Sequence, residues 1–243
     1  MCPRTARLPA PRLRQRAPTP QRPAQSHTGS RRSTLGGVPG SETTYDSDPY
    51  DVVPYKNGYA VADAAANAVL FISHTGKVSL IARLGTEPEQ VPAGVFGPYA
   101  MPVDAQAVPT SIAVGPDGAL YVGLLRGVPS LPGTAQVDRV LPGKAPTVWA
   151  KGLTAVTAIA FDGKGRLLAT EYSTGGLLAP PTVPGALVRI SATGSTVTTL
   201  PVNGLFQPTG VAVSPNGAIY LANYGTQPAT AKTPGEVLKI TGF

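Results

Sequence analysis

One short pattern recurs along the chain and constrains its fold more than any other feature. It reads IAVGPDGALYV at residues 112–122 and VAVSPNGAIYL at 211–221, with more divergent copies at 159–169 and 52–62. Each copy has two alternating apolar runs separated by a tight turn rich in Pro, Asp, Asn and Gly. This is typical of a β-hairpin with two half-buried strands. The sequence therefore predicts an all-β protein built from repeated hairpins.

Composition supports many turns and removes one apparent clue to function. The 243 residues include 28 Gly and 27 Pro, which favour turns over long helices. The formal charge of +7 is confined to residues 1–45, which hold eight arginines and a single acidic residue, Glu42. The remainder is neutral. Because the positive charge belongs to a tail, it does not indicate a nucleic-acid partner for the folded part, and none is expected.

Residues 1–45 are expected to be disordered, because they contain too few apolar side chains to offset the entropy of ordering. Three interpretations remain open: a basic arm for an anionic partner, an Arg-rich targeting peptide, and a segment that is not native to the fold. The only cysteine, Cys2, lies in this tail, so no disulfide within the chain is expected. We recognise no membrane span and no signal peptide in the sequence.

Alignment of the copies predicts a repeating unit of four strands. Equivalent first strands begin near residues 49, 109, 156 and 208, which is a spacing typical of β-propeller blades. We expect blades at about 48–84, 108–153, 155–205 and 207–243. The last blade shows only three strands, and the tail has no strand pattern to supply a fourth. The sequence thus predicts an open sheet edge, which favours aggregation.

Loop lengths distinguish the two faces of such a propeller. The turns between strands one and two, and between strands three and four, are short and lie on one face. Longer segments at 84–108, 124–135, 172–185 and 224–235 lie on the other, which we call the elaborated face. Because binding sites usually reside on loops of a rigid scaffold, we expect a ligand there. The alternative is that these segments are merely tolerated insertions.

The folded part resembles one family of propellers. The matching segments are DSDPYDVV at 46–53, AVADAAANAVLFIS at 60–73, AQAVPTSIAVGPDGALYVG at 105–123 and GEVLKI at 235–240. Over 46–243 the chain resembles the C-terminal part of the ScyD/ScyE family of NHL-like propellers. The resemblance implies a protein of about six blades that is exported to the cell envelope or outside the cell. By that comparison the chain lacks the first blades and the export signal.

Catalysis by a nucleophile is not expected, because His27 lies in the tail and His74 in a short turn, so neither can serve a triad. The catalytic alternative is a metal-dependent lactonase or esterase, resembling the gluconolactonase and strictosidine synthase propellers. Such enzymes place Asp, Asn and Glu ligands on the central axis. The corresponding positions here hold Tyr50, Thr110, Thr157 and Thr209. Hydroxyl groups are poor ligands for calcium, which argues against this alternative.

The ends of the second strands present a further set of polar residues on the elaborated face. The blades carry Asp63, Leu124, Glu171 and Asn223 there. The polar members could cap loop backbone, bind a ligand or ion, or take part in catalysis. The candidate ligand-binding residues are Asp63, Glu171, Asn223, Thr110, Thr157 and Thr209. No cofactor or metal is expected, with calcium as the alternative.

These observations favour a non-catalytic protein that binds a protein, glycan or small molecule on the elaborated face. The hydrolase described above is the alternative, and a truncated product without function is a third interpretation. If the propeller is complete, a monomer is expected.

Overall fold

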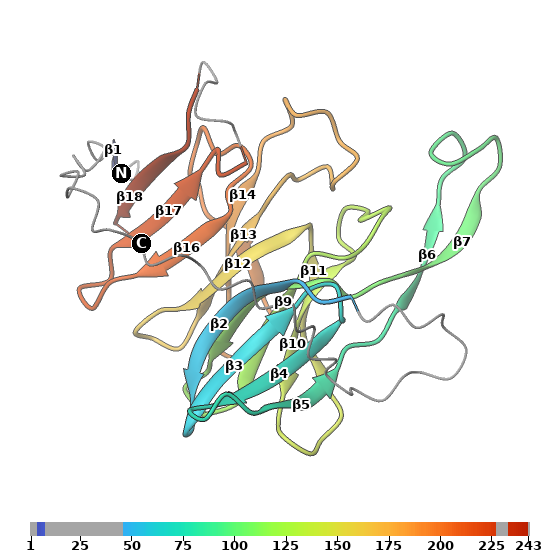
Figure 1. Ribbon diagram of the computed structural model, residues 1–243. Coiled ribbons are helices and arrows are strands. Elements are labelled where there is room, and N and C mark those ends of the chain that lie inside the picture. The colour runs from blue at the N-terminus through green and yellow to red at the C-terminus, as the bar shows by residue number, and fades with distance from the viewer. Residues whose placement is uncertain (1–3, 8–45, 227–232, 243) are drawn as a thin grey trace, which may run out of the picture. The chain divides into compact units, whose positions relative to one another are not determined.

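The computed structural model describes residues 4–7, 46–226 and 233–242, which form β-sheets joined by turns and loops (Figure 1). Four antiparallel sheets of four strands, blades 1 to 4, follow one another along the chain. Blade 1 contains β2 (Pro49–Tyr55), β3 (Gly58–Asp63), β4 (Ala68–Ser73) and β5 (Val78–Arg83). Blade 2 contains β8 (Pro109–Val114), β9 (Leu120–Leu124), β10 (Ala135–Val140) and β11 (Thr147–Leu153).

Blades 3 and 4 repeat the arrangement. Blade 3 contains β12 (Val156–Phe161), β13 (Leu167–Glu171), β14 (Ala186–Ile190) and β15 (Val197–Thr199). Blade 4 contains β16 (Gly210–Val213), β17 (Ile219–Asn223), β18 (Glu236–Thr241) and β1 (Arg4–Arg7). The recurring sequence pattern forms hairpins of neighbouring strands, as predicted. Gly118 and Gly217 adopt φ angles of +74° and +81° in these turns, where residues with a Cβ are disfavoured.

The fourth blade corrects one prediction. The sequence predicted that this blade lacks its outer strand, but β1 pairs antiparallel with β18 from Arg4↔Thr241 to Arg7↔Leu238. Four residues beside the amino terminus thus supply the missing strand, although their sequence RTAR has no apolar alternation. Backbone hydrogen bonds can add such a strand to a sheet without a particular side-chain pattern. The rest of the predicted disordered tail lies outside the described residues.

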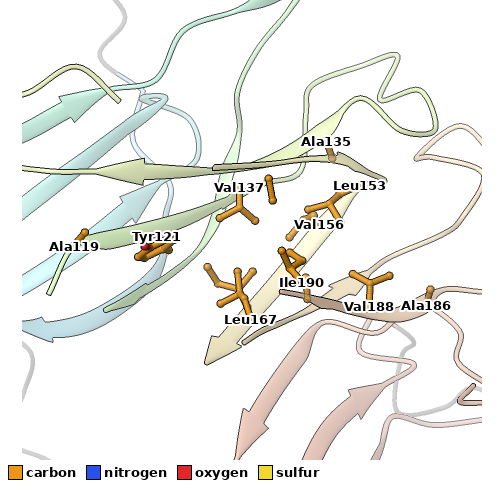
Figure 2. Close-up of a cluster of buried hydrophobic side chains, with 13 residues drawn as sticks. Ala119, Tyr121, Ala135, Val137, Leu153, Val156, Leu167, Ala186, Val188 and Ile190 are labelled. Atoms are coloured by element: carbon orange, nitrogen blue, oxygen red, sulfur yellow. The ribbon is translucent and has the colours of Figure 1, made fainter. Parts of the chain in front are cut away.

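The blades pack face to face through apolar cores, as expected for a β-propeller. Their first strands are neighbours in chain order, β2 beside β8, β8 beside β12, and β12 beside β16. Figure 2 shows the core between blades 2 and 3, where Val137 and Leu153 face Val156 and Leu167. Similar cores lie between blades 1 and 2 and between blades 3 and 4. The hydrophobic effect therefore holds consecutive blades together as well as the strands within them.

An additional hairpin interrupts the connection between blades 1 and 2. Strands β6 (Glu87–Val91) and β7 (Met101–Ala105) form a separate two-stranded sheet, which extends away from the blades in Figure 1. The sequence predicted an insertion here but not its strands, because the first of them, EPEQV, holds three polar residues and a proline. Among the described residues, no helix has the length and hydropathy needed to cross a membrane.

Candidate functional site

The polar residues at the ends of the second strands cap loop backbone. The carboxylate of Asp63 accepts hydrogen bonds from the backbone N–H of Asp48 at 2.8 Å and of Ala66 at 3.1 Å, and from the Ser47 hydroxyl at 2.5 Å. Its side chain is buried. Three donors on one buried carboxylate fix the chain as it enters blade 1.

Asn223 and Glu171 hold the corresponding entries to blades 4 and 3. The amide oxygen of Asn223 accepts from the N–H of Phe206 at 2.8 Å, and its nitrogen donates to the carbonyl of Gly204 at 3.0 Å. Glu171 accepts from the N–H of Thr154 at 2.8 Å. The capping interpretation thus describes the observed contacts of all three residues.

Blade 2 obtains the same cap from a residue that sequence reasoning missed. Its second strand ends in the apolar Leu124, and the N–H of Val108 instead donates to the side-chain oxygen of Asn67 at 2.8 Å. Asn67 belongs to the preceding blade and has a φ angle of +47°. One sign of this cap is present in the sequence, an Asn within a turn of small residues. Asn adopts a positive φ angle more readily than most residues.

The threonines of the first strands join neighbouring blades. The hydroxyl of Thr110 donates to the carbonyl of Val156, and that of Thr157 to the carbonyl of Pro208, both at 2.7 Å. In each case the acceptor precedes the equivalent threonine of the next blade. Thr209, the third member of this series, is partly buried beside Gly225, where an added Cβ would lie 1.8 Å from its Oγ1.

The structure therefore distributes the six candidate residues over separate caps and blade contacts. Among the described residues, no group of three or more His, Cys, Asp or Glu side chains is placed to hold a metal ion. Ligand binding by Asp63, Glu171, Asn223, Thr110, Thr157 and Thr209 stays a prediction.

A pocket lies on the elaborated face, formed by the long loop of blade 3. Its volume is about 230 Å³. The lining is Tyr172, Ser173, Gly176, Leu177, Ala179, Pro180, Pro181, Val183 and Gln207. Sequence analysis expected a ligand site among these loops but did not identify the lining, which combines a Pro-rich loop with a residue 24 positions beyond it.

Close backbone contacts hold the loop that forms this pocket. Gly176 has a φ angle of +82°, and an added Cβ would lie 2.1 Å from the carbonyl oxygen of Ser130 in the loop of blade 2. An added Cβ on Gly185 would lie 2.4 Å from Pro208 and 2.6 Å from the carbonyl oxygen of Glu171. Since only glycine fits at both points, the loop is tied to the entries of the adjacent blades.

The pocket has an apolar wall and a polar end. The hydroxyls of Tyr172 and Thr226 lie 3.1 Å apart, and Thr226 donates to the side-chain oxygen of Gln207 at 2.9 Å. The pKa of Tyr50 is raised, mainly by burial and to a smaller extent by the charges of Asp48 and Tyr172.

Buried polar groups also stabilise the loop of blade 2. Arg126 donates to the carbonyl of Thr134 at 3.2 Å and to Gln136 at 3.1 Å, and Gln136 donates to Asp138 at 2.7 Å. Burial raises the pKa of Asp138, and the hydrogen bond from Gln136 and the charge of Arg126 oppose this effect only in part. This chain of contacts holds the loop against β10 and was not foreseen from the sequence.

Glu171 gives a pH-dependent prediction. Burial raises its pKa above 4.5, and the hydrogen bond from Thr154 only partly opposes this shift. A carboxyl group with a raised folded pKa stabilises the fold below its unfolded pKa, and this stabilisation is lost as the pH rises through the folded value. We expect Glu171→Gln, which keeps the acceptor for Thr154, to gain stability relative to the wild type as the pH rises above about 4.

Urea unfolding at a series of pH values measures this difference. Asp162→Asn serves as the control of opposite sign. Burial opposes ionisation of Asp162, but the hydrogen bonds from Arg166 and Lys164 outweigh it and hold its pKa below 3.8. The Asp162 variant should therefore lose stability relative to the wild type as the pH rises. A Glu171 variant whose relative stability falls with rising pH would contradict the assignment.

Comparison with known proteins gives similarity of fold at low identity. No protein-family model and no curated protein sequence matches the chain. Among solved structures, a gluconolactonase from Xanthomonas campestris is 16% identical, with a TM-score of 0.44, over 69% of this chain and 50% of that protein. A glucose dehydrogenase is 17% identical, with a TM-score of 0.49, over 73% of this chain and 57% of that protein. A streptogramin B lyase is 14% identical, with a TM-score of 0.45, over 82% of this chain and 67% of that protein.

The chain thus spans about half to two thirds of the length of these proteins. All three names describe enzymes. At these identities and TM-scores, however, the likeness concerns the fold and carries no argument about activity.

Proposed function

We propose that the chain is a non-catalytic binding protein whose ligand site is the pocket at the blade 3 loop. The observation that carries this proposal is a cavity with an apolar wall and a polar end, at Tyr172 and Gln207, on the elaborated face. Its volume of about 230 Å³ is below the ~300–1,000 Å³ of pockets that enclose a whole drug-sized ligand. The pocket therefore suits one ring or branched group that carries a polar substituent.

Filling the pocket tests the proposal. Ala179→Trp places a large side chain on the wall, whereas Leu178→Trp changes the neighbouring residue, which is 52% exposed and outside the lining. Ligand-observed NMR with phenols, indoles and methyl glycosides should detect saturable binding to the wild type and to the Leu178 variant. Binding to the Ala179 variant should be at least ~10-fold weaker, since the volume of the site is occupied. Equal binding to both variants would place the site elsewhere.

A second candidate function is hydrolysis of a lactone or ester. Glu171 favours it, because a buried carboxyl group with a raised pKa at the end of a strand is suited to proton transfer. The name of the Xanthomonas protein supplies the first substrate class to assay. Turnover of lactones that a chelator abolishes and calcium restores would replace the binding proposal with the hydrolase.

We also propose that the chain belongs to the ScyD/ScyE family and acts at the cell envelope or outside the cell. The segments quoted above, from 46 to 240, support this proposal. Mass spectrometry of amino-terminal peptides from cells and culture supernatant of the native source tests the location. Recovery from the cell interior alone would contradict it.

A further inference from the structure

Consecutive blades are joined by the same two sheet faces. We call them the preceding face, which is turned to the blade before, and the following face, which is turned to the blade after. In blades 2 to 4 the preceding face is apolar and largely buried. It includes Ile112, Leu120 and Val122 in blade 2, Ile159, Leu167 and Ala169 in blade 3, and Ile219, Leu221 and Ile240 in blade 4.

Blade 1 has the same apolar pattern on its preceding face. Strand pairing places Val52 opposite Val61, and Val61 opposite Leu70. Val61 and Leu70, in the middle of this face, are buried at 5% and 8%. Val52 nevertheless has 55% of its surface exposed and Tyr59 43%, whereas Ile112, which corresponds to Val52, has 2%. Among the described strands of the other blades, the extensive neighbour of blade 1 is β8, which lies on its following face. Blade 1 therefore exposes residues that the other blades bury.

The following face of blade 4 is the matching surface. It carries Tyr220 and Val237, at the positions that Tyr121 and Val137 occupy in blade 2. Val137 is fully buried against the next blade, but 47% of Val237 is exposed. The Tyr121 ring contacts Phe161 of the next blade. The Tyr220 ring has the amine of Lys239, a residue of the same blade, at 5.9 Å from its centroid.

We propose that the following face of blade 4 binds the preceding face of blade 1 in a second copy of the chain. This head-to-tail contact continues the three blade interfaces that the chain already forms, with the same kinds of side chain on each surface. In it Tyr220 packs against Pro54 of the second copy, because Pro54 corresponds in register to Phe161. The Thr209 hydroxyl donates to the carbonyl of Pro49, as Thr157 donates to Pro208.

A contact between two different surfaces has a distinctive consequence for mixtures. Each copy presents both surfaces, so a substitution in either one affects every contact between identical copies. Consider a mixture of two variants, one changed in blade 1 and the other changed in blade 4. The first variant keeps an intact blade 4 surface, and the second keeps an intact blade 1 surface. Association through that pair of surfaces returns. A contact that uses one surface twice would not show this recovery.

Sedimentation equilibrium of the full chain tests the proposal. The wild type is expected to form species of at least twice its mass of 24.8 kDa as its concentration rises. Val52→Asp and Val237→Lys should each weaken association at least ~10-fold, because each places a charge in an apolar contact. An equimolar mixture of the two should associate again. Val148→Asp is the control, because Val148 is an exposed valine on β11 of an internal blade.

Circular dichroism confirms that each variant is folded, and Tyr59→Glu replaces Val52→Asp if that variant unfolds. A wild type that stays monomeric would overturn the proposal. Association that survives both substitutions, or a mixture that does not recover, would overturn it as well.

Discussion

Tyr121→Ala is expected to lower the free energy of unfolding by about 3–5 kcal/mol. The ring lies between blades 2 and 3, in edge-to-face contact with Trp149 and Phe161 at centroid distances of 4.9 Å. Removing it takes away buried area and leaves a cavity in the core shown in Figure 2. Urea unfolding followed by the fluorescence of Trp149, the only tryptophan, measures the loss directly.

Two controls separate the ring from other effects of this substitution. Tyr121→Phe keeps the ring and removes the hydroxyl, which contacts Asp117 at 3.3 Å and Arg139, and it should cost about 0.5–1.5 kcal/mol. Tyr99→Ala changes a tyrosine that is 81% exposed and should stay within about 0.5 kcal/mol of the wild type. A loss below about 1 kcal/mol for Tyr121→Ala would mean that the two blades do not share this core.

Gly194→Ala is expected to be the second strongly destabilising change, at about 2–5 kcal/mol. Gly194 adopts a φ angle of +77° in the turn between β14 and β15. An added Cβ would also lie 2.3 Å from the carbonyl oxygen of Trp149, in the preceding blade. The substitution therefore combines backbone strain with a clash against an atom that cannot move without disturbing β11.

Gly143→Ala separates these two causes. Gly143 occupies the equivalent turn of blade 2 with a φ angle of +74°, but an added Cβ would have no atom within 4 Å. We expect only the conformational cost, about 1–2 kcal/mol. Thermal or urea unfolding of both variants gives the difference that the contact with Trp149 contributes. Equal losses at the two positions would show that blade 3 does not approach Trp149 in this way.

The repeated threonines and end-of-strand polar residues illustrate how one position can indicate both structure and function. Thr110 and Thr157 were candidates for ligand binding because they occupy the axis positions where some propeller enzymes carry metal ligands. In the structure they join blades, and Asp63, Glu171 and Asn223 cap the chain where it enters a blade. A polar residue at a repeated position can therefore serve the backbone of its repeat, whatever the protein binds.

The hairpin repeat was sufficient to predict the strand pattern, because the alternation of apolar residues and the Gly turns act locally. The positions of the strands in blade 2, for example, follow from the apolar residues between Ser111 and Val140. The sequence also located the elaborated face, since loop lengths can be counted. These features depend on residues that are neighbours in the chain, and so they can be recognised without knowledge of the fold.

Contacts between distant residues were decided only by the tertiary structure. Arg4–Arg7 completes blade 4 more than 200 residues away, and its sequence RTAR has no apolar alternation that would mark a strand. Asn67 caps the entry to the next blade, and Gln207 closes a pocket formed by the loop that begins at Tyr172. Such pairings depend on how the blades pack, which the periodicity of a single strand does not encode.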